Sequence, residues 1–136
     1  SDIVWVSPNA FRTALLDAPL DAPDGGYAPH HPTRMVEFDL SGESPSVTEH
    51  FSVTDVIFFT VRVSPDGQAM SYIRYHTTPD SPLRDLVIHP IGGEPIVLAT
   101  SESVYGAEWL DESHIAWQEL EQSFIGDVCG DVTSAR

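Results

Sequence analysis

The stretch Val61-Arg62-Val63-Ser64-Pro65-Asp66-Gly67-Gln68-Ala69-Met70-Ser71-Tyr72 places a tight turn between two apolar runs. In this turn Pro65 presets φ at about −65°, Asp66 can accept a hydrogen bond from its own backbone, and Gly67 tolerates a positive φ. The turn therefore has a structural role, and Asp66 is not expected to be catalytic. Strands are predicted on both sides of it, at residues 56–61 and 69–75.

A second turn, Ile91-Gly92-Gly93-Glu94-Pro95, lies between β-type runs at residues 84–89 and 96–99. Gly92 and Gly93 are assigned to this turn as structural residues, like Pro65, Asp66 and Gly67 in the first. The order of strand, turn, strand, loop, strand, turn and strand predicts a four-stranded antiparallel meander.

Weaker patterns flank this unit. Residues 34–40 alternate so that Val36, Phe38 and Leu40 are expected to face inward. Residues 10–17 could form one or two helical turns that Pro19 would end. The tail has a weak β signal at Phe124 and Ile125 and is otherwise turn-like. Further strands are expected at residues 1–6, 46–50, 104–109 and 114–120.

Parts of the central unit recur along the chain. Val36-Glu37-Phe38 aligns with Leu86-Val87-Ile88, and the match continues without a gap to Val47 and Val97. Residues 70–72 align with residues 115–117, and residues 3–5 fit the same slot. A repeat of about 45 to 50 residues is typical of propeller blades of four strands, which bury their apolar faces by stacking.

These motifs resemble the Pro-Asp repeat of TolB-type β-propellers, which are WD40-like. The resemblance rests on Ser64-Pro65-Asp66-Gly67, the strand that follows it, Gly92-Gly93-Glu94 and the closing Leu98-Ala99-Thr100. It departs at Leu110-Asp111-Glu112-Ser113, where the Pro-Asp-Gly turn is missing. The resemblance implies an all-β fold and one propeller segment over residues 1–136.

The blades follow from the repeat. They are a partial blade over residues 1–52 with a long loop at 7–32, a full blade over 53–100 and a partial blade over 101–136. A propeller needs at least about four blades to close. We therefore expect the chain to be a piece of a longer polypeptide, or to receive its neighbouring blades from elsewhere.

For function, the resemblance implies a non-catalytic scaffold for protein–protein interaction. One alternative is the gating propeller of a prolyl-oligopeptidase-like serine peptidase whose catalytic domain is not in this chain. Another is a glycan-binding propeller. Such blades occur in periplasmic adaptors and surface lipoproteins, so a periplasmic or extracellular location is expected, with a cytoplasmic one still open.

The chain is strongly acidic, with 21 Asp and Glu against six basic residues, all of them arginine, and a formal net charge of −15. Such a surface disfavours nucleic acid and anionic membranes, and no run approaches the roughly 18 apolar residues of a membrane span. The expected partners are another protein or the remaining blades of the propeller. The acids are scattered, which favours solvation at high salt (a halophilic surface) over an acidic docking or cation-binding face.

No catalytic motif stands out, and the chain is not expected to be an enzyme. The six histidines lack metal-ligand spacing, so neither a metal nor a cofactor is expected. Cys129 has no histidine partner in a defined motif, and a Gly-x-Ser-x-Gly elbow is missing. The aromatic residues are assigned to the core between blades, with a carbohydrate platform as the alternative: Trp5, Phe58, Tyr72, Trp109 and Trp117.

By elimination, the long loop at residues 7–32 is the candidate binding site. Tyr27, His30 and His31 lie beside Gly25-Gly26 and could offer aromatic and polar contacts. Loops between blade strands gather at the faces of a propeller, where partners bind. An insertion without a role is the alternative for this loop.

Overall fold

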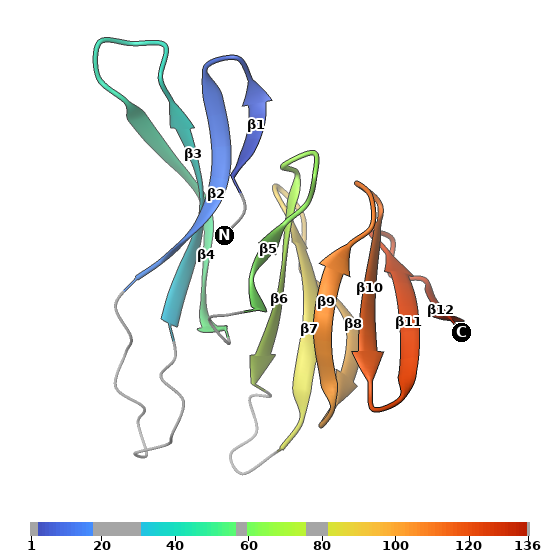
Figure 1. The fold of residues 1–136 in the computed structure, drawn as a ribbon. Coiled ribbons are helices and arrows are strands. Elements are labelled where there is room, and N and C mark those ends of the chain that lie inside the picture. Colours follow the sequence, from blue (N-terminus) through green and yellow to red (C-terminus); the bar gives the residue numbers. More distant parts are fainter. Residues whose placement is uncertain (1–2, 18–30, 57–59, 76–81, 136) are drawn as a thin grey trace.

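The computed structural model describes residues 3–17, 31–56, 60–75 and 82–135 (Figure 1). Within these ranges the regular structure is β-strand, and no helix is long and apolar enough to cross a membrane. The all-β prediction is therefore confirmed. The strands are β1 Val4–Ser7, β2 Ala10–Leu16, β3 His31–Asp39, β4 Ser46–Val56, β5 Arg62–Val63, β6 Ala69–Tyr75, β7 Arg84–Pro90, β8 Ile96–Ser101, β9 Val104–Trp109, β10 His114–Glu119, β11 Gln122–Asp127 and β12 Val132–Ala135.

These strands form three antiparallel meanders of four strands each, β1–β4, β5–β8 and β9–β12. A single backbone bridge, between Val56 of β4 and Arg74 of β6, joins the first meander to the second. Figure 1 shows the three sheets side by side in the order of the chain. The described strands form an open stack and do not close into a ring.

The middle sheet agrees closely with the strands predicted around the two turns. β6 has the predicted bounds, and β7 and β8 each extend slightly beyond theirs. In the third sheet, β9 also has the predicted bounds. The apolar run before the first turn differs, since β5 has only Arg62 and Val63. The predicted strand at residues 56–61 overlaps the end of β4 at Val56, and residues 57–59 lie outside the described ranges.

The region expected to be helical or loop contains a strand instead. Ala10–Leu16 is β2, and it pairs with β3 from Ala10↔Asp39 to Leu16↔Thr33. The predicted helical turns at residues 10–17 are therefore wrong, and the loop predicted at 7–32 is shorter at both ends. Alanine and leucine favour helix locally, but pairing with a neighbouring strand overrides that preference. β1 pairs with β2 at the edge of its sheet, so residues 3–5 do not occupy the second-strand position of β6.

The C-terminal tail was also predicted wrongly as mostly turn. It contains β11 and β12, which complete a four-stranded sheet. Gly126 explains part of the error, because it interrupts the β pattern of the sequence. In the structure a Cβ at Gly126 would lie 2.8 Å from Cζ3 of Trp117. The glycine makes room for a buried ring and does not mark a turn.

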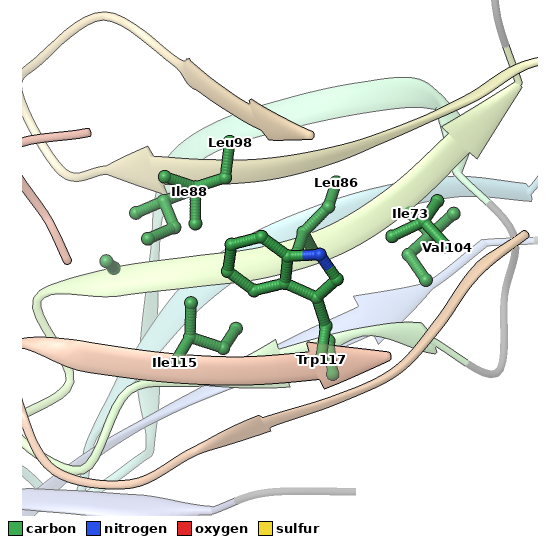
Figure 2. Packing of buried hydrophobic residues seen from close by; sticks show 9 residues of the cluster. Ile73, Leu86, Ile88, Leu98, Val104, Ile115 and Trp117 are labelled. Atoms are coloured by element: carbon green, nitrogen blue, oxygen red, sulfur yellow. The ribbon is translucent and has the colours of Figure 1, made fainter. Parts of the chain in front are cut away.

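The middle sheet buries both of its faces. Toward the first sheet, Met70, Tyr72 and Val87 pack with Met35 and Val56. The opposite face packs against β9–β12 in the core of Figure 2: Ile73, Leu86, Ile88, Leu98, Val104, Ile115 and Trp117. Each such side chain contributes about 1.5–3 kcal/mol on burial. These two clusters hold the three sheets together.

The inward face of β3 differs from the prediction. Val36 is fully buried as expected, but Leu40 is exposed, and Met35 is fully buried although it belongs to the other set. The pairing of β3 with β4 shifts between Met35 and Val36, where one extra residue of β4 is accommodated. Met35 packs against the middle sheet, so both sides of β3 are covered at this point.

Candidate functional site

The predicted binding residues fall largely outside the described structure. Tyr27 and His30 lie outside it, and of His31 only the backbone is described, paired with Val56 at the start of β3. The predicted site in the loop at residues 7–32 therefore stays a prediction. Other surfaces have to be considered on their own geometry.

The Ser64–Gln68 turn is held by side-chain hydrogen bonds. Oδ1 of Asp66 accepts hydrogen bonds from the Ser64 hydroxyl at 2.7 Å and from the Gln68 backbone N–H at 3.0 Å. Gly67 has φ of 72°, and a Cβ there would lie 2.8 Å from Cγ1 of Val6. Pro65 is exposed at the tip. In the second turn Gly92 has φ of 74°, and a Cβ at Gly93 would lie 2.9 Å from Pro90.

Four described turns at the upper end of the sheets in Figure 1 use the same aspartate chemistry. In each, Oδ1 of an aspartate accepts the backbone N–H two residues further on, an arrangement typical of Asx-turns. The aspartates are Asp39, Asp66, Asp111 and Asp127. Because these carboxylates bind their own turns, their first role is to shape the loops.

Hydrogen bonding also changes the acidity of two of these carboxyls. The Ser41 hydroxyl and backbone lower the pKa of Asp39. The backbone N–H of Ser113 and the ring of His114 lower the pKa of Asp111. Both groups therefore stay ionised, which is the form that accepts these hydrogen bonds.

A groove lies between the turns of the second and third sheets. One cavity of about 310 Å³ is lined by Ser64, Asp66 and Glu112, and a second of about 490 Å³ reaches His114. Nδ1 of His114 lies 3.0 Å from Oδ1 of Asp111. Within the described part of the chain no serine or cysteine hydrogen-bonds to a histidine, and no three His, Cys, Asp or Glu side chains are grouped to hold a metal. Nothing in this groove forms a nucleophile–base pair.

The junction between the first and middle sheets contains a second group of polar residues. Arg12 donates to the Glu37 carboxylate at 2.7 Å and to the carbonyl of Gly67 at 2.9 Å. This bonding by Arg12 is the main cause of the lowered pKa of Glu37. Nearby, the ring of His89 stacks on Phe51 with centroids 3.8 Å apart, and burial lowers the pKa of His89. These contacts tie β1–β4 to the turns of the middle sheet.

The outer face of the first sheet is the largest departure from the predicted core. Trp5, expected to be buried between blades, is 57% exposed. Its ring centroid lies 5.1 Å from that of Phe11, which in turn lies 5.1 Å from Phe38. Val47 pairs with Phe38 and is 52% exposed. We call this row of Trp5, Phe11, Phe38 and Val47 the aromatic face.

The other aromatic assignments have mixed outcomes. Tyr72 and Trp117 are fully buried, as predicted for the core, whereas Trp109 is half-buried and Phe58 lies outside the described residues. Period-two alternation shows which residues share one side of a strand. It does not show whether that side is buried or exposed, so the sequence did not identify the aromatic face. Cys129 is an exposed free thiol in the β11–β12 turn.

The outer face of the third sheet has a different character. Ile115 and Trp117 point toward the middle sheet, so the alternate residues His114, Ala116 and Gln118 of β10 point away from it. Their partners on β11 are Asp127, Ile125 and Ser123. The two ends of the stack thus differ, one apolar and aromatic and the other mainly polar.

Comparison with known proteins adds no relative. No protein-family model matches the chain, and no curated protein is significantly similar to it.

Proposed function

We propose that the chain is a segment of a TolB-like β-propeller that acts as a non-catalytic scaffold for protein–protein interaction, outside the cytoplasm. Three observations support the propeller segment. The sheets have four antiparallel strands each, they follow one another along the chain, and the middle one is covered on both faces by its neighbours. Stacked sheets of this kind are the building plan of propeller blades.

The aromatic face carries the proposed interaction. Trp5 and Val47 expose more than half of their side chains on one continuous row, although apolar side chains of this size are usually covered. The chain itself shows what covers such a face, because each face of β5–β8 is covered by the apolar face of a four-stranded sheet. The proposed partner is therefore the apolar face of a β-sheet in a second polypeptide.

Charge strengthens this choice. The side chains of the aromatic face are uncharged, in a chain with a formal net charge of −15. On the same side of β3 as Phe38, Arg34 forms ion pairs with Asp17 at 3.0 Å and with Glu49 at 3.9 Å. A partner sheet would meet little local charge, and the remaining repulsion between two acidic chains is long-ranged and screened by salt.

The test uses a second copy of the chain as the partner sheet. We expect sedimentation velocity to show reversible self-association that strengthens from 0.15 to 1 M salt. Val47→Glu puts a charge on the aromatic face and should abolish the association. The matched control is Val97→Glu, because Val97 is the repeat equivalent of Val47 and is 47% exposed. A monomer at all concentrations, or equal loss in both variants, would refute the proposal.

A further inference from the structure

A small cavity lies between the middle sheet and β9, away from the aromatic face. Its volume is about 180 Å³, and its lining includes Arg62, Ile73, Arg84, Val104 and Gly106. An apolar cavity of about 150 Å³ is enough to hold a benzene ring. The space therefore fits one ring or one branched side chain.

The strand register brings two arginines to this cavity. Arg62 on β5 pairs with Ser71, and Arg84 on β7 pairs with Tyr75, so both lie on the same face of the sheet as Ile73 of β6. That face is the one that packs against β9–β12. The two side chains lie 22 positions apart in sequence, and only the meander places them together.

Arg84 differs from the other arginines in its bonding. The guanidinium groups of Arg12, Arg34 and Arg74 each lie within 3.1 Å of a carboxylate oxygen. Within the described residues the guanidinium of Arg84 makes no hydrogen bond or ion pair, although the chain has 21 acids for six bases. Arg62 also lines the cavity and donates to the carbonyl of Val61 at 2.8 Å.

The rest of the lining combines an apolar wall with backbone and with the polar side chains of Thr60, Tyr105 and Glu108. Ile73, Val104 and Ala107 are buried and form an apolar wall. β9 is an edge strand, so alternate peptide groups between Val104 and Trp109 point away from β10. A Cβ at Gly106 would have no atom closer than 4.0 Å, which leaves the backbone open there.

We propose that this cavity binds a carboxylate carried on a single ring or branched apolar group, with Arg84 as its charge partner. The planar guanidinium matches the two oxygens of a carboxylate, and the apolar wall accepts the attached group. Glu108 at the same cavity and the acidic surface repel anions, and they repel a doubly charged phosphate more strongly than a singly charged carboxylate. The carboxylate could come from a free aromatic acid or from the C-terminus of a peptide. This site is separate from the proposed sheet-docking face.

The experiment is an NMR titration of the ¹⁵N-labelled chain with benzoate, with benzamide and phosphate as comparisons. We expect benzoate to shift the amide resonances of Gly106 and Ala107, while benzamide and phosphate leave them in place. A tripeptide ending in a free phenylalanine carboxylate, and the same peptide as its C-terminal amide, distinguish the two sources. Binding of the free peptide but not the amide assigns a peptide C-terminus, and binding of benzoate alone assigns a small acid.

Arg84→Gln should weaken the binding of benzoate at least about tenfold, since a hydrogen bond to a charged group is worth about 1.5–3 kcal/mol. If the free-carboxylate tripeptide is the ligand that binds, its affinity should fall by the same factor. Arg34→Gln is the matched control and should leave binding unchanged, because Arg34 lies on the first sheet. Equal shifts with benzamide or with phosphate, or equal affinity in Arg84→Gln, would overturn the proposal. So would a failure of both benzoate and the free-carboxylate tripeptide to shift the resonances. The comparison of benzoate with benzamide on the unmodified chain needs no variant, so it holds even if Arg84→Gln does not fold.

Discussion

Gly126→Ala tests whether the third sheet packs as described. A methyl group at this position would lie 2.8 Å and 3.0 Å from two ring atoms of Trp117 and 3.0 Å from Cδ1 of Leu98. The ring has little freedom to move, because Trp117 is fully buried and stacks on Phe124 with centroids 5.7 Å apart. The substitution therefore overpacks the core between the second and third sheets.

The size of the effect follows from two opposing terms. Overpacking a core by one methyl costs about 1–3 kcal/mol. Replacing glycine by alanine also reduces the entropy of the unfolded chain, which returns about 0.4–1 kcal/mol. At the middle of these ranges the net loss in the free energy of unfolding is about 1.3 kcal/mol. With a urea m-value of about 2 kcal/mol per molar, the midpoint falls by roughly 0.7 M.

The assay is urea unfolding followed by near-UV circular dichroism and by tryptophan fluorescence. Gly42→Ala is the control, because Gly42 is exposed and its added Cβ meets only Ser44 O at 3.5 Å. We expect the control to unfold like the parent chain. A midpoint for Gly126→Ala at or above that of the parent chain, or an equal fall in Gly42→Ala, would refute the packing of Trp117 against Gly126.

Three further predictions concern the turns, pH and salt. Asp66→Ala removes the acceptor for Ser64 and Gln68 and should cost about 1 kcal/mol in urea unfolding; an unchanged midpoint would contradict the bracing role of Asp66. Burial lowers the pKa of His89 in the folded chain, so the unfolded chain binds more protons and the free energy of unfolding should fall as pH drops below about 6.5. His89→Gln should reduce this fall. An identical pH profile in the variant and the parent chain would contradict the role of His89. With a net charge of −15, the melting temperature should rise from 0.1 to 1 M salt, and a flat or falling curve would reject the halophilic interpretation.

The sequence predicts the central meander well for a physical reason. Around Ser64–Gln68 and Gly92–Gly93, turn residues with fixed backbone preferences separate runs of β-forming residues, so local chemistry and final structure agree. β2 is the opposite case, because Ala10–Leu16 contains helix-favouring residues and becomes a strand only through its pairing with β3. Its strand conformation is decided by partner residues that lie 17 to 29 positions away in sequence.

The candidate sites were harder to predict than the fold. The aromatic face depends on which side of β1–β4 meets the middle sheet, and alternation does not tell the two sides apart. The cavity at Arg84 depends on the register of three strands, which the separate residues Arg62, Ile73 and Arg84 do not reveal. Hydrophobic patterning identifies strands, whereas a site is made by the way strands are placed side by side.

If the aromatic face docks as proposed, the difference between the two ends of the stack would limit how large an assembly can grow. The aromatic face can dock on a second copy through the same surface, which gives a two-fold contact that uses up the apolar area of both chains. The faces left outside are the polar ones of β9–β12, with His114 and Gln118 on them. Under this proposal the assembly would be complete at two chains and would not extend into a filament.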